Sequence, residues 1–310
     1  MASSTVKLLT IGIPTYNRSI YLRECLDHIC PQLTDEVQVV VRDNCSNNYD
    51  FDSFVAPYIQ KYGIKAFRNS TNIGGNANIA RLFEECVTDW LWVIGDDDYI
   101  VEGAVELALK TIKKNKDFLY IKFNAPYIGE TIGLDGFCEA MKTRGAFAYS
   151  FFTSECLNNI SLTHNMMFWH YEYLSTYCPQ ILRVIKCLTQ NNAGKCLFLT
   201  DIVLEEHGSD ISWTRSDIVP YQLLIFDIFR DYRCKFKDNI FKAITSYCLV
   251  YIESSNLSIK DKLYYYSLFF HKVGLINIIR YNFIQVVRIP LRILLNKKLY
   301  NRLKRIVKRG

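Results

Sequence analysis

The chain has 310 residues, of which 50% are hydrophobic and 22% charged, a globular composition that excludes a disordered or fibrous protein. No run of about 18 uncharged apolar residues occurs, which argues against a membrane-spanning helix. The formal net charge of +6 is uneven, because residues 262–310 hold twelve basic and no acidic side chains, while the preceding part has a balance of −6.

Eleven cysteines are scattered along the sequence, an odd number with no CxxC pair. This pattern argues against a disulfide framework and against a zinc site. The first residues, MASSTVKLLT, lack the charged and apolar regions of a signal peptide. We therefore expect a cytoplasmic protein whose thiols are free and packed as small hydrophobic side chains.

Strand patterns and helix patterns alternate over the first 125 residues. Short apolar or β-branched runs predict strands at residues 8–14, 37–41, 64–67, 90–94 and 118–123. Periodic apolar positions predict helices between them, the first capped by Ser19 and the others at residues 51–62, 76–86 and 102–115. The alternation implies an α/β fold with a mostly parallel sheet flanked by helices. Residues 126–215 are less regular, and residues 216–310 read as helical and aromatic-rich.

Three polar clusters follow predicted strands at the points where those strands end. They are Thr15–Arg18, Asp43–Asn44 and Asp96–Asp98. Open parallel sheets bind ligands beyond the carboxyl ends of their strands, so these clusters form the candidate site. The segment Asn72–Arg81 adds amide donors and a guanidinium that can contact a nucleotide or its phosphates.

The acidic triplet Asp96–Asp98 is the sharpest chemical signal in the sequence. Adjacent carboxylates repel one another unless a cation or solvent neutralises them. Oxygen-rich clusters suit Mg²⁺ or Mn²⁺, which bind one or two carboxylates together with substrate phosphates. Plainer interpretations stay open: the triplet is a solvated acidic turn, Asp43 an Asx-turn residue and Arg81 an exposed side chain behind a helix cap.

Four segments, in this order and spacing, resemble family 2 glycosyltransferases with a GT-A fold. They are IGIPTYNR (Ile11–Arg18), VVVRDNCSNN (Val39–Asn48), NSTNIGGNANIAR (Asn69–Arg81) and WLWVIGDDDYI (Trp90–Ile100). The resemblance implies a GT-A, Rossmann-like domain over residues 1–215, with a nucleotide-binding half at 7–125 and an acceptor half at 126–215. A helical C-terminal region at 216–310 follows.

The resemblance also implies roles for individual residues. The implied nucleotide-sugar site consists of Pro14, Thr15, Tyr16, Arg18, Asp43, Asn72, Gly75, Asn78, Arg81, Asp96 and Asp97. Asp98 is the last residue of the family's DXD signature, and it is expected to be catalytic by coordinating a divalent metal, Mn²⁺ or Mg²⁺. Asp96 is expected to contact the ribose or to take part in the metal site. Similar enzymes invert the anomeric centre: a carboxylate deprotonates the acceptor hydroxyl, and the metal stabilises the leaving nucleoside diphosphate.

The sequence departs from the family pattern where the general base is expected. Many relatives carry a Glu-Asp pair at the start of a helix in the second half, but Thr176–Gln180 contains no carboxylate. The remaining candidates for the base, each equally explained as a surface or cap residue, are Glu155, His170, Glu172 and Asp201. His207 is a further candidate metal ligand, and Trp213 is a candidate for stacking on the acceptor sugar.

These patterns favour a metal-dependent, inverting transferase that moves a sugar from a nucleoside-diphosphate donor to a saccharide or lipid-linked saccharide. The product would belong to a cell-surface polysaccharide such as O-antigen or capsule. The missing carboxylate pair keeps open a non-catalytic protein that binds a sugar nucleotide or a glycan through a degenerate site. A nucleotidyltransferase is less consistent with the sequence, because no Gly-rich pyrophosphate loop with a lysine follows the first predicted strand.

The basic C-terminal segment predicts an anionic partner. Leu299, Leu303, Ile306 and Val307 fall on one helical face and basic residues surround them, although Pro290 should break any longer helix. A basic amphipathic helix suits an anionic membrane surface, which would place the protein peripherally on the cytoplasmic face of the inner membrane. The alternative is a helix packed on the body with a solvated basic face. No nucleic-acid motif accompanies the charge, so nucleic acid is not an expected partner.

Overall fold

A computed structural model of the chain describes residues 7–126, 128–140, 153–163, 165, 167–176, 179–205, 252 and 257–274. The chain divides into two compact units, residues 1–213 and 214–310. All described strands belong to the first unit.

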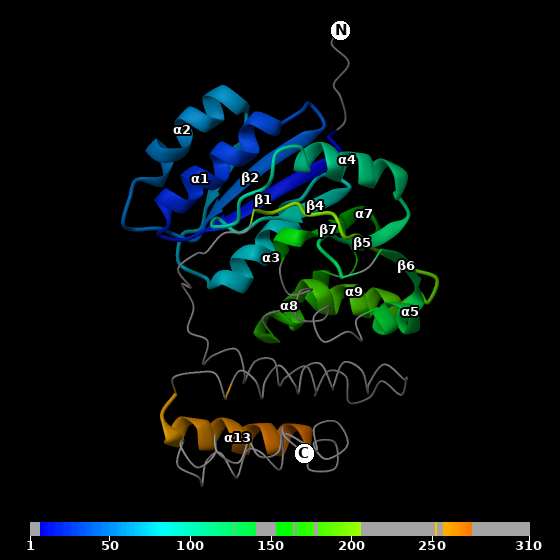
Figure 1. The fold of residues 1–310 in the computed structure, drawn as a ribbon. Coiled ribbons are helices and arrows are strands. Elements are labelled where there is room, and N and C mark those ends of the chain that lie inside the picture. Colours follow the sequence, from blue (N-terminus) through cyan, green and yellow to red (C-terminus); the bar gives the residue numbers. More distant parts are fainter. Residues whose placement is uncertain are drawn as a thin grey trace, which may run out of the picture. The chain divides into compact units, whose positions relative to one another are not determined.

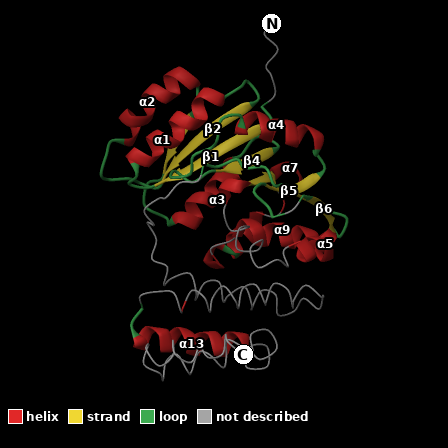
Figure 2. Cartoon of the chain, viewed as in Figure 1, coloured by secondary structure: helices red, strands yellow, loops and turns green. Residues whose placement is uncertain are grey.

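The first unit is organised around one sheet, whose described strands run in the order β3-β2-β1-β4-β7-β5-β8-β6 (Figure 1, Figure 2). The strands are β1 (Leu9–Thr15), β2 (Val37–Asp43), β3 (Lys65–Arg68), β4 (Trp90–Val93), β5 (Phe118–Lys122), β6 (Gly129–Ile132), β7 (Cys156–Asn159) and β8 (Lys195–Phe198). Strands β3, β2, β1 and β4 pair in parallel, and so do β5 and β8. Strand β7 is antiparallel to both of its neighbours, and β6 is antiparallel to β8.

Helices cover both faces of this sheet. The helices described in the first unit are α1 (Ser19–Ile29), α2 (Phe51–Tyr62), α3 (Gly75–Glu85), α4 (Ala104–Lys114), α5 (Gly133–Ala140), α7 (Ile160–Thr163), α8 (Met167–Glu172) and α9 (Pro179–Gln190). Figure 1 shows α1, α2 and α4 on one side of the strands and α3 on the other. The sheet is therefore the middle layer of a three-layer α/β arrangement.

The two faces of the central strands pack into separate cores. Ile11 and Trp92 belong to the core that contains the apolar side chains of α1, α2 and α4. Val40 and Leu91 pack instead with Leu82 of α3. Because successive residues of a strand point to opposite faces and both faces are covered, these strands appear in the sequence as continuous apolar runs.

The predicted α/β fold is confirmed, and the strands and helices predicted before residue 125 agree with the structure to within a few residues. One local prediction is wrong. Ser19 is the first residue inside α1, and Arg18 occupies the N-cap position with no side-chain cap hydrogen bond. Helix α2 is capped as local rules expect, since Asp50 accepts a hydrogen bond from Ser53 N and Gly63 ends the helix with φ 65°.

The irregular second half completes the same sheet. Strand β7 enters between β4 and β5, so these two strands of the predicted parallel series are not neighbours. The indole of Trp92 in β4 donates a hydrogen bond to Ser154 O, 2.7 Å away, just before β7 begins. This insertion brings residues 153–159 beside the loop that follows β4.

The described part of the second unit is Ile252 with residues 257–274, which include helix α13 (Ile259–Val273). Ser258 caps α13 by accepting a hydrogen bond from Asp261 N at 3.1 Å. Among the described helices, none has the length and apolar character needed to cross a bilayer. Seven described cysteines are free thiols, and six of them are buried.

A buried ion pair joins β5 to the start of β7. The Lys122 ammonium donates to a Glu155 carboxylate oxygen and also to Phe123 O at 2.7 Å. Asn124 donates from its side-chain nitrogen to the other Glu155 oxygen at 2.7 Å. The side chain of Lys122 is 2% exposed and that of Glu155 is 9% exposed, so both charged groups are largely removed from water.

Removing one partner of this pair should destabilise the protein strongly. Lys122→Met leaves the Glu155 charge buried without its cation, and we expect it to lower the free energy of unfolding by about 3–5 kcal/mol in urea denaturation. The double variant Lys122→Met/Glu155→Leu should be more stable than Lys122→Met alone, because no buried charge remains. Lys195→Met, which breaks the exposed pair with Asp117, is the matched control and should move the midpoint little. If Lys122→Met lowers the free energy of unfolding no more than the control does, Glu155 does not require the Lys122 ammonium.

Candidate active site

The carboxyl ends of three neighbouring parallel strands meet at one edge of the sheet. In the register of the sheet, Thr15 at the end of β1 lies beside Asp43 at the end of β2. On the other side of β1, Gly12 lies beside Val93 at the end of β4. The Thr15 hydroxyl donates to a carboxylate oxygen of Asp96 at 2.7 Å, which ties the loop after β4 to β1. The predicted convergence of the polar clusters is thereby confirmed.

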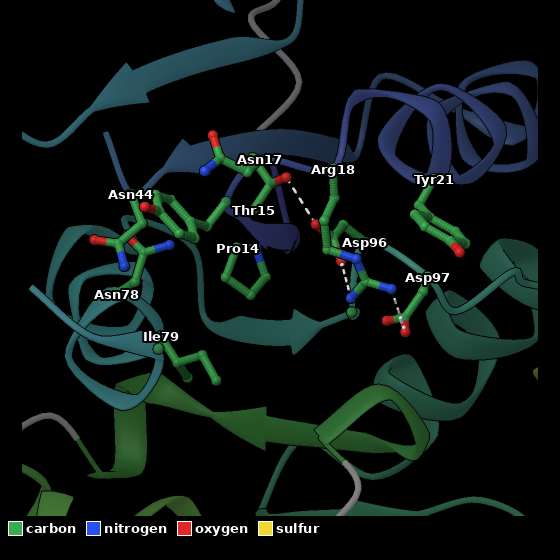
Figure 3. A pocket seen from close by; sticks show the side chains of 13 residues that line it. Pro14, Thr15, Asn17, Arg18, Tyr21, Asn44, Asn78, Ile79, Asp96 and Asp97 are labelled. Atoms are coloured by element: carbon green, nitrogen blue, oxygen red, sulfur yellow. Dashed lines mark hydrogen bonds and ion pairs between the residues drawn. The ribbon is translucent and has the colours of Figure 1, made fainter. Parts of the chain in front are cut away.

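Arg18 forms ion pairs with two carboxylates of the acidic triplet. Its Nη1 lies 3.0 Å from an Asp96 oxygen, and its Nη2 donates to an Asp97 oxygen at 2.8 Å. The guanidinium also lies 4.5 Å from the centre of the Tyr21 ring. Figure 3 shows the Arg18 side chain reaching across the site to both carboxylates. The triplet is therefore not a solvated acidic turn.

Burial shifts the protonation of these groups. Burial raises the pKa of Asp96 to about 7, and the neighbouring charges of Asp97 and Asp98 add to the rise against the opposing effect of Arg18. Burial also raises the pKa of Asp98, opposed by its hydrogen bond with Ser154. Burial lowers the pKa of Arg18, but the Asp97 hydrogen bond and the two carboxylate charges outweigh it, so that pKa is raised. Negative charge is costly here unless a cation is present.

The loop after β1 is fastened to the loop after β2 by Asn17, which has a φ of 58°. Its side-chain oxygen accepts a hydrogen bond from Asn47 N at 2.8 Å, and its backbone N–H donates to Ser46 Oγ at 2.7 Å. Asparagine tolerates the left-handed region better than other residues with a side chain. The conformation directs Arg18 toward the sheet edge.

Four asparagines connect the loop after β2 with α3. Asn69 donates to the side-chain oxygens of Asn44 and Asn78, at 3.0 and 2.8 Å. Asn44 donates in turn to Asn72 at 2.8 Å, and Asn78 donates to Arg42 O at 2.9 Å. These hydrogen bonds fix the start of α3, so that the wall it forms is rigid before any ligand binds.

These loops enclose an open cleft with a volume of about 660 Å³ (Figure 3). The residues that line it are Pro14, Thr15, Tyr16, Asn17, Arg18, Tyr21, Asn44, Gly75, Asn78, Ile79, Gly95, Asp96 and Asp97. Eight of them belong to the predicted nucleotide-sugar site: Pro14, Thr15, Tyr16, Arg18, Gly75, Asn78, Asp96 and Asp97. The volume is in the range of small-molecule sites.

Three residues of the predicted nucleotide-sugar site, Asp43, Asn72 and Arg81, and the predicted metal ligand Asp98 do not line this cleft. Asp43 is fully buried, and its carboxylate accepts hydrogen bonds from Ser46 N and Ser46 Oγ, as in the Asx-turn alternative. Asp98 accepts a hydrogen bond from Ser154 Oγ. Asn72 is exposed and accepts from Gly74 N at 2.9 Å, and Arg81 is exposed in an ion pair with Glu84. Their predicted roles stay predictions.

The candidates for the general base are separated from the cleft. Glu155 is held in the buried pair with Lys122, and His170 is fully buried against Phe83 with its ring 4.5 Å away. Glu172 and Asp201 are exposed, and neither lines the cleft. His207 and Trp213 lie outside the described residues.

Five residues that line the cleft had no individual role assigned from the sequence, although Asn17 and Asn44 belong to the predicted strand-end clusters and Ile79 to the segment Asn72–Arg81. The five are Asn17, Tyr21, Asn44, Ile79 and Gly95. Tyr21 follows Arg18 by three positions on a helix, a spacing that puts two side chains on one face. Ser154, which binds Asp98, carries no such signal, because it is 56 residues away in the sequence.

Residues 10–135 match the model of the family described as glycosyl transferase family 2. These residues form a family 2 glycosyltransferase domain. An uncharacterised glycosyltransferase of Haemophilus influenzae is 25% identical over 114 residues, which cover 37% of this chain and 37% of that protein. Abequosyltransferase RfbV of Salmonella typhimurium is 28% identical over 128 residues, covering 37% of this chain and 35% of that protein. The chain thus matches little more than a third of the length of these curated relatives.

Several solved structures of other proteins have a fold similar to that of this chain. S. aureus TarS 1-349 superposes with a TM-score of 0.62 at 16% identity, covering 86% of this chain and 81% of that one. The same protein in complex with UDP-GlcNAc gives 0.61 at 14% identity, with 86% and 82% covered. Mannosyltransferase PcManGT from Pyrobaculum calidifontis, in complex with GDP-Man and Mn²⁺, gives 0.53 at 13% identity, with 88% and 86% covered. The GT-A fold predicted from the four sequence segments is confirmed.

A buried histidine should make the stability of the protein depend on pH. Burial lowers the pKa of His170 well below its ordinary value, and the charge of Arg183 lowers it further. Among the described residues, neither ring nitrogen has a hydrogen-bond partner. As the pH falls through about 6.5, the unfolded chain binds a proton at this histidine and the folded protein does not. The contribution of His170 to the free energy of unfolding should therefore fall from pH 7.5 to 5.5, by up to about 1.4 kcal/mol per pH unit. Asp96 contributes in the opposite direction, because its raised pKa of about 7 lets the folded protein bind a proton that the unfolded chain does not.

Denaturant unfolding across this pH range checks the effect. His170→Phe removes the titrating ring while keeping an aromatic group against Phe83, so its free energy of unfolding relative to the wild type should increase as the pH falls through this range. His271→Gln removes an exposed histidine of α13 and should keep the wild-type slope. A His170→Phe variant with the slope of the wild type would show that this residue does not control the dependence.

Proposed function

We propose that this protein transfers a sugar from a nucleoside-diphosphate donor to a saccharide or lipid-linked saccharide acceptor. The observation that carries the proposal is one cleft, formed by the strand-end loops of the family 2 domain, in which Asp96 and Asp97 lie beside Thr15 and Arg18. The names of the relatives, both glycosyltransferases, support the reaction class. Cell-surface polysaccharide synthesis, of the O-antigen or capsule type, is the proposed context.

The two walls of the cleft divide the donor between them. Pro14, Thr15 and Tyr16 come from the end of β1, and Gly75 and Asn78 from the start of α3. We assign the base and ribose to the space between these walls, because Tyr16 offers an exposed aromatic face and Asn78 an amide. Asp43, beneath this wall, would contribute by holding the loop through Ser46 or by turning toward the base. TarS with UDP-GlcNAc and PcManGT with GDP-Man support a nucleoside-diphosphate sugar as the ligand.

The acidic triplet fits a hard divalent cation by the chemistry of its donor atoms. Asp96 and Asp97 line the cleft and Asp98 follows them in the same loop, and carboxylate oxygens are the ligands that Mg²⁺ and Mn²⁺ prefer. Among the described residues, no three His, Cys, Asp or Glu side chains already converge on one point, so the oxygens would have to turn toward an incoming ion. Asp98 and Asp96 are the proposed ligands, with His207 as a further one. A bound cation would supply charge stabilisation for the leaving diphosphate.

The transfer itself is proposed to invert the anomeric centre. The acceptor oxygen forms a bond to the anomeric carbon as the bond to the donor diphosphate breaks, and a carboxylate takes the hydroxyl proton. Arg18 and the amides of the cleft would orient the donor. Glu172 and Asp201 are the exposed carboxylates proposed for the proton transfer, with Trp213 on the acceptor sugar. Residues 126–215 would form the acceptor half.

A second candidate is a non-catalytic protein that binds a sugar nucleotide or a glycan. Two observations favour it: Arg18 already forms ion pairs with Asp96 and Asp97, and among the described residues no other carboxylate lines the cleft. Donor binding without transfer or donor hydrolysis, across a set of acceptors, would establish this second function. Release of pyrophosphate instead of a nucleoside diphosphate would point to a nucleotidyltransferase.

Donor selection is tested by thermal shift with a panel of nucleoside diphosphates and their sugars, each with and without Mn²⁺. One nucleotide should stabilise the protein selectively, by about 2.7 kcal/mol at a hundredfold excess over its Kd. Asp98→Asn and EDTA should each lower transfer about 100-fold or more, with the nucleoside diphosphate as the released product. Asp117→Asn, which changes an exposed aspartate between α4 and β5, is the matched control. Full turnover in Asp98→Asn or in EDTA would refute metal-dependent transfer.

We also propose that the basic tail docks the protein on the cytoplasmic face of the inner membrane. The support is the sequence pattern alone, because residues 282–310 lie outside the described residues. The full chain should sediment with anionic liposomes, whereas a chain that ends at residue 281 should stay in the supernatant. Neutral phosphatidylcholine liposomes are the control for charge. Equal sedimentation of both chains would exclude the tail as the anchor.

A further inference from the structure

The Arg18 guanidinium occupies the position that a divalent cation would need. It spans two neighbouring carboxylates, with Nη1 3.0 Å from Asp96 Oδ1 and Nη2 2.8 Å from Asp97 Oδ2 (Figure 3). The second oxygen of Asp96 accepts the hydrogen bond from Thr15. Both oxygens of Asp96 and one of Asp97 are thus already engaged.

The arrangement holds Arg18 in place from several directions. The side chain of Arg18 is 17% exposed, that of Asp96 is 6% exposed and that of Asp97 is 22% exposed, so water weakly screens these charges. The ring of Tyr21 lies 4.5 Å from the guanidinium and gives it a cation–π contact. Arg18 itself stands at the N-cap of α1, where its side chain makes no cap hydrogen bond.

Two cations compete for one set of oxygens. A divalent ion that binds Asp96 or Asp97 must displace the guanidinium or pull the carboxylate away from it. The displaced guanidinium then needs another anion, because an unpaired buried charge is unfavourable. A diphosphate in the same cleft offers such an anion, and planar guanidinium groups bind phosphate oxygens through two parallel hydrogen bonds.

We propose that Arg18 is a positioning residue that occupies the carboxylate pair in the ligand-free protein and passes to the diphosphate when a divalent cation takes its place. This inference rests on the proposed function, since that function supplies the diphosphate. It predicts that the metal and the nucleotide favour each other's binding. The cation releases Arg18 to bind the diphosphate, and the diphosphate compensates the charge of the released guanidinium. A metal ion alone should bind the wild-type protein weakly.

Titration of the full chain with Mn²⁺ alone, followed by electron paramagnetic resonance, tests the competition without any substrate. Arg18→Gln frees the carboxylates and should bind Mn²⁺ at least about tenfold more tightly than the wild type. Arg18→Lys keeps the charge but loses the two-pronged contact, so its affinity should lie between the two. Arg23→Gln removes one positive charge from the same helix, away from the triplet, and should match the wild type.

A second titration tests the transfer of Arg18 to the diphosphate. With saturating Mn²⁺ present, UDP and GDP should each be compared for binding to the wild type and to Arg18→Gln, and the nucleotide that binds should bind the variant several-fold more weakly. Circular dichroism melts verify folding, and Arg18→Lys serves for both titrations if Arg18→Gln does not fold.

Equal Mn²⁺ affinity in Arg18→Gln, Arg23→Gln and the wild type would overturn the inference, as would a nucleotide affinity that Arg18→Gln leaves unchanged. If neither nucleotide binds the wild type, UDP and GDP are excluded as the donor nucleotide, while the other nucleoside diphosphates of the thermal-shift panel decide the donor class. The manganese titration still decides whether Arg18 blocks the carboxylates.

Discussion

The geometry of the candidate site depends on how three adjacent, largely buried carboxylates are held in the loop after β4. Asp96, Asp97 and Asp98 follow an apolar strand, and Asp96 retains only 5% of its surface. Their mutual repulsion would open the loop unless each found a partner. Arg18 binds the first two and Ser154 binds the third, so the loop after β4 is clamped from both sides. The protein's own chain therefore supplies one positive charge, from Arg18, to this acidic edge.

The parallel pairing of β2, β1 and β4 makes the clamp possible. Parallel strands in register end at the same edge, so residues about 80 positions apart in the sequence come within hydrogen-bond distance. Asn17 then fixes the loop that carries Arg18, and the asparagines after β2 fix the start of α3. Because the walls are already hydrogen-bonded, a ligand would lose little ordering entropy in this cleft. In the proposed exchange, Arg18 and the carboxylates that face the cation are the side chains that turn.

The antiparallel strand β7 adds the other half of the constraint. It brings Ser154 to Gly95 and Asp98, and it places Glu155 opposite Lys122 of β5. The buried pair fixes the chain just beyond Ser154, so the position of the third carboxylate depends on the part of the chain where the resemblance to the family fades. A charged pair in the interior seldom adds stability by itself. Here its effect is to hold one segment in register beside the acidic loop.

The sequence alone determined the elements before residue 125, the α/β class and the meeting of Thr15, Arg18 and Asp96 at one edge, because apolar periodicity and the alternation of strands with helices can be read locally. Only the tertiary structure decided which way each carboxylate turns. Asp43 turns to Ser46, Asp98 to Ser154 and Glu155 to Lys122, and each of these choices depends on burial and on a partner that the sequence spacing does not reveal. The insertion of β7 between β4 and β5 was equally hidden, since a four-residue strand with no periodic pattern takes its place from its neighbours.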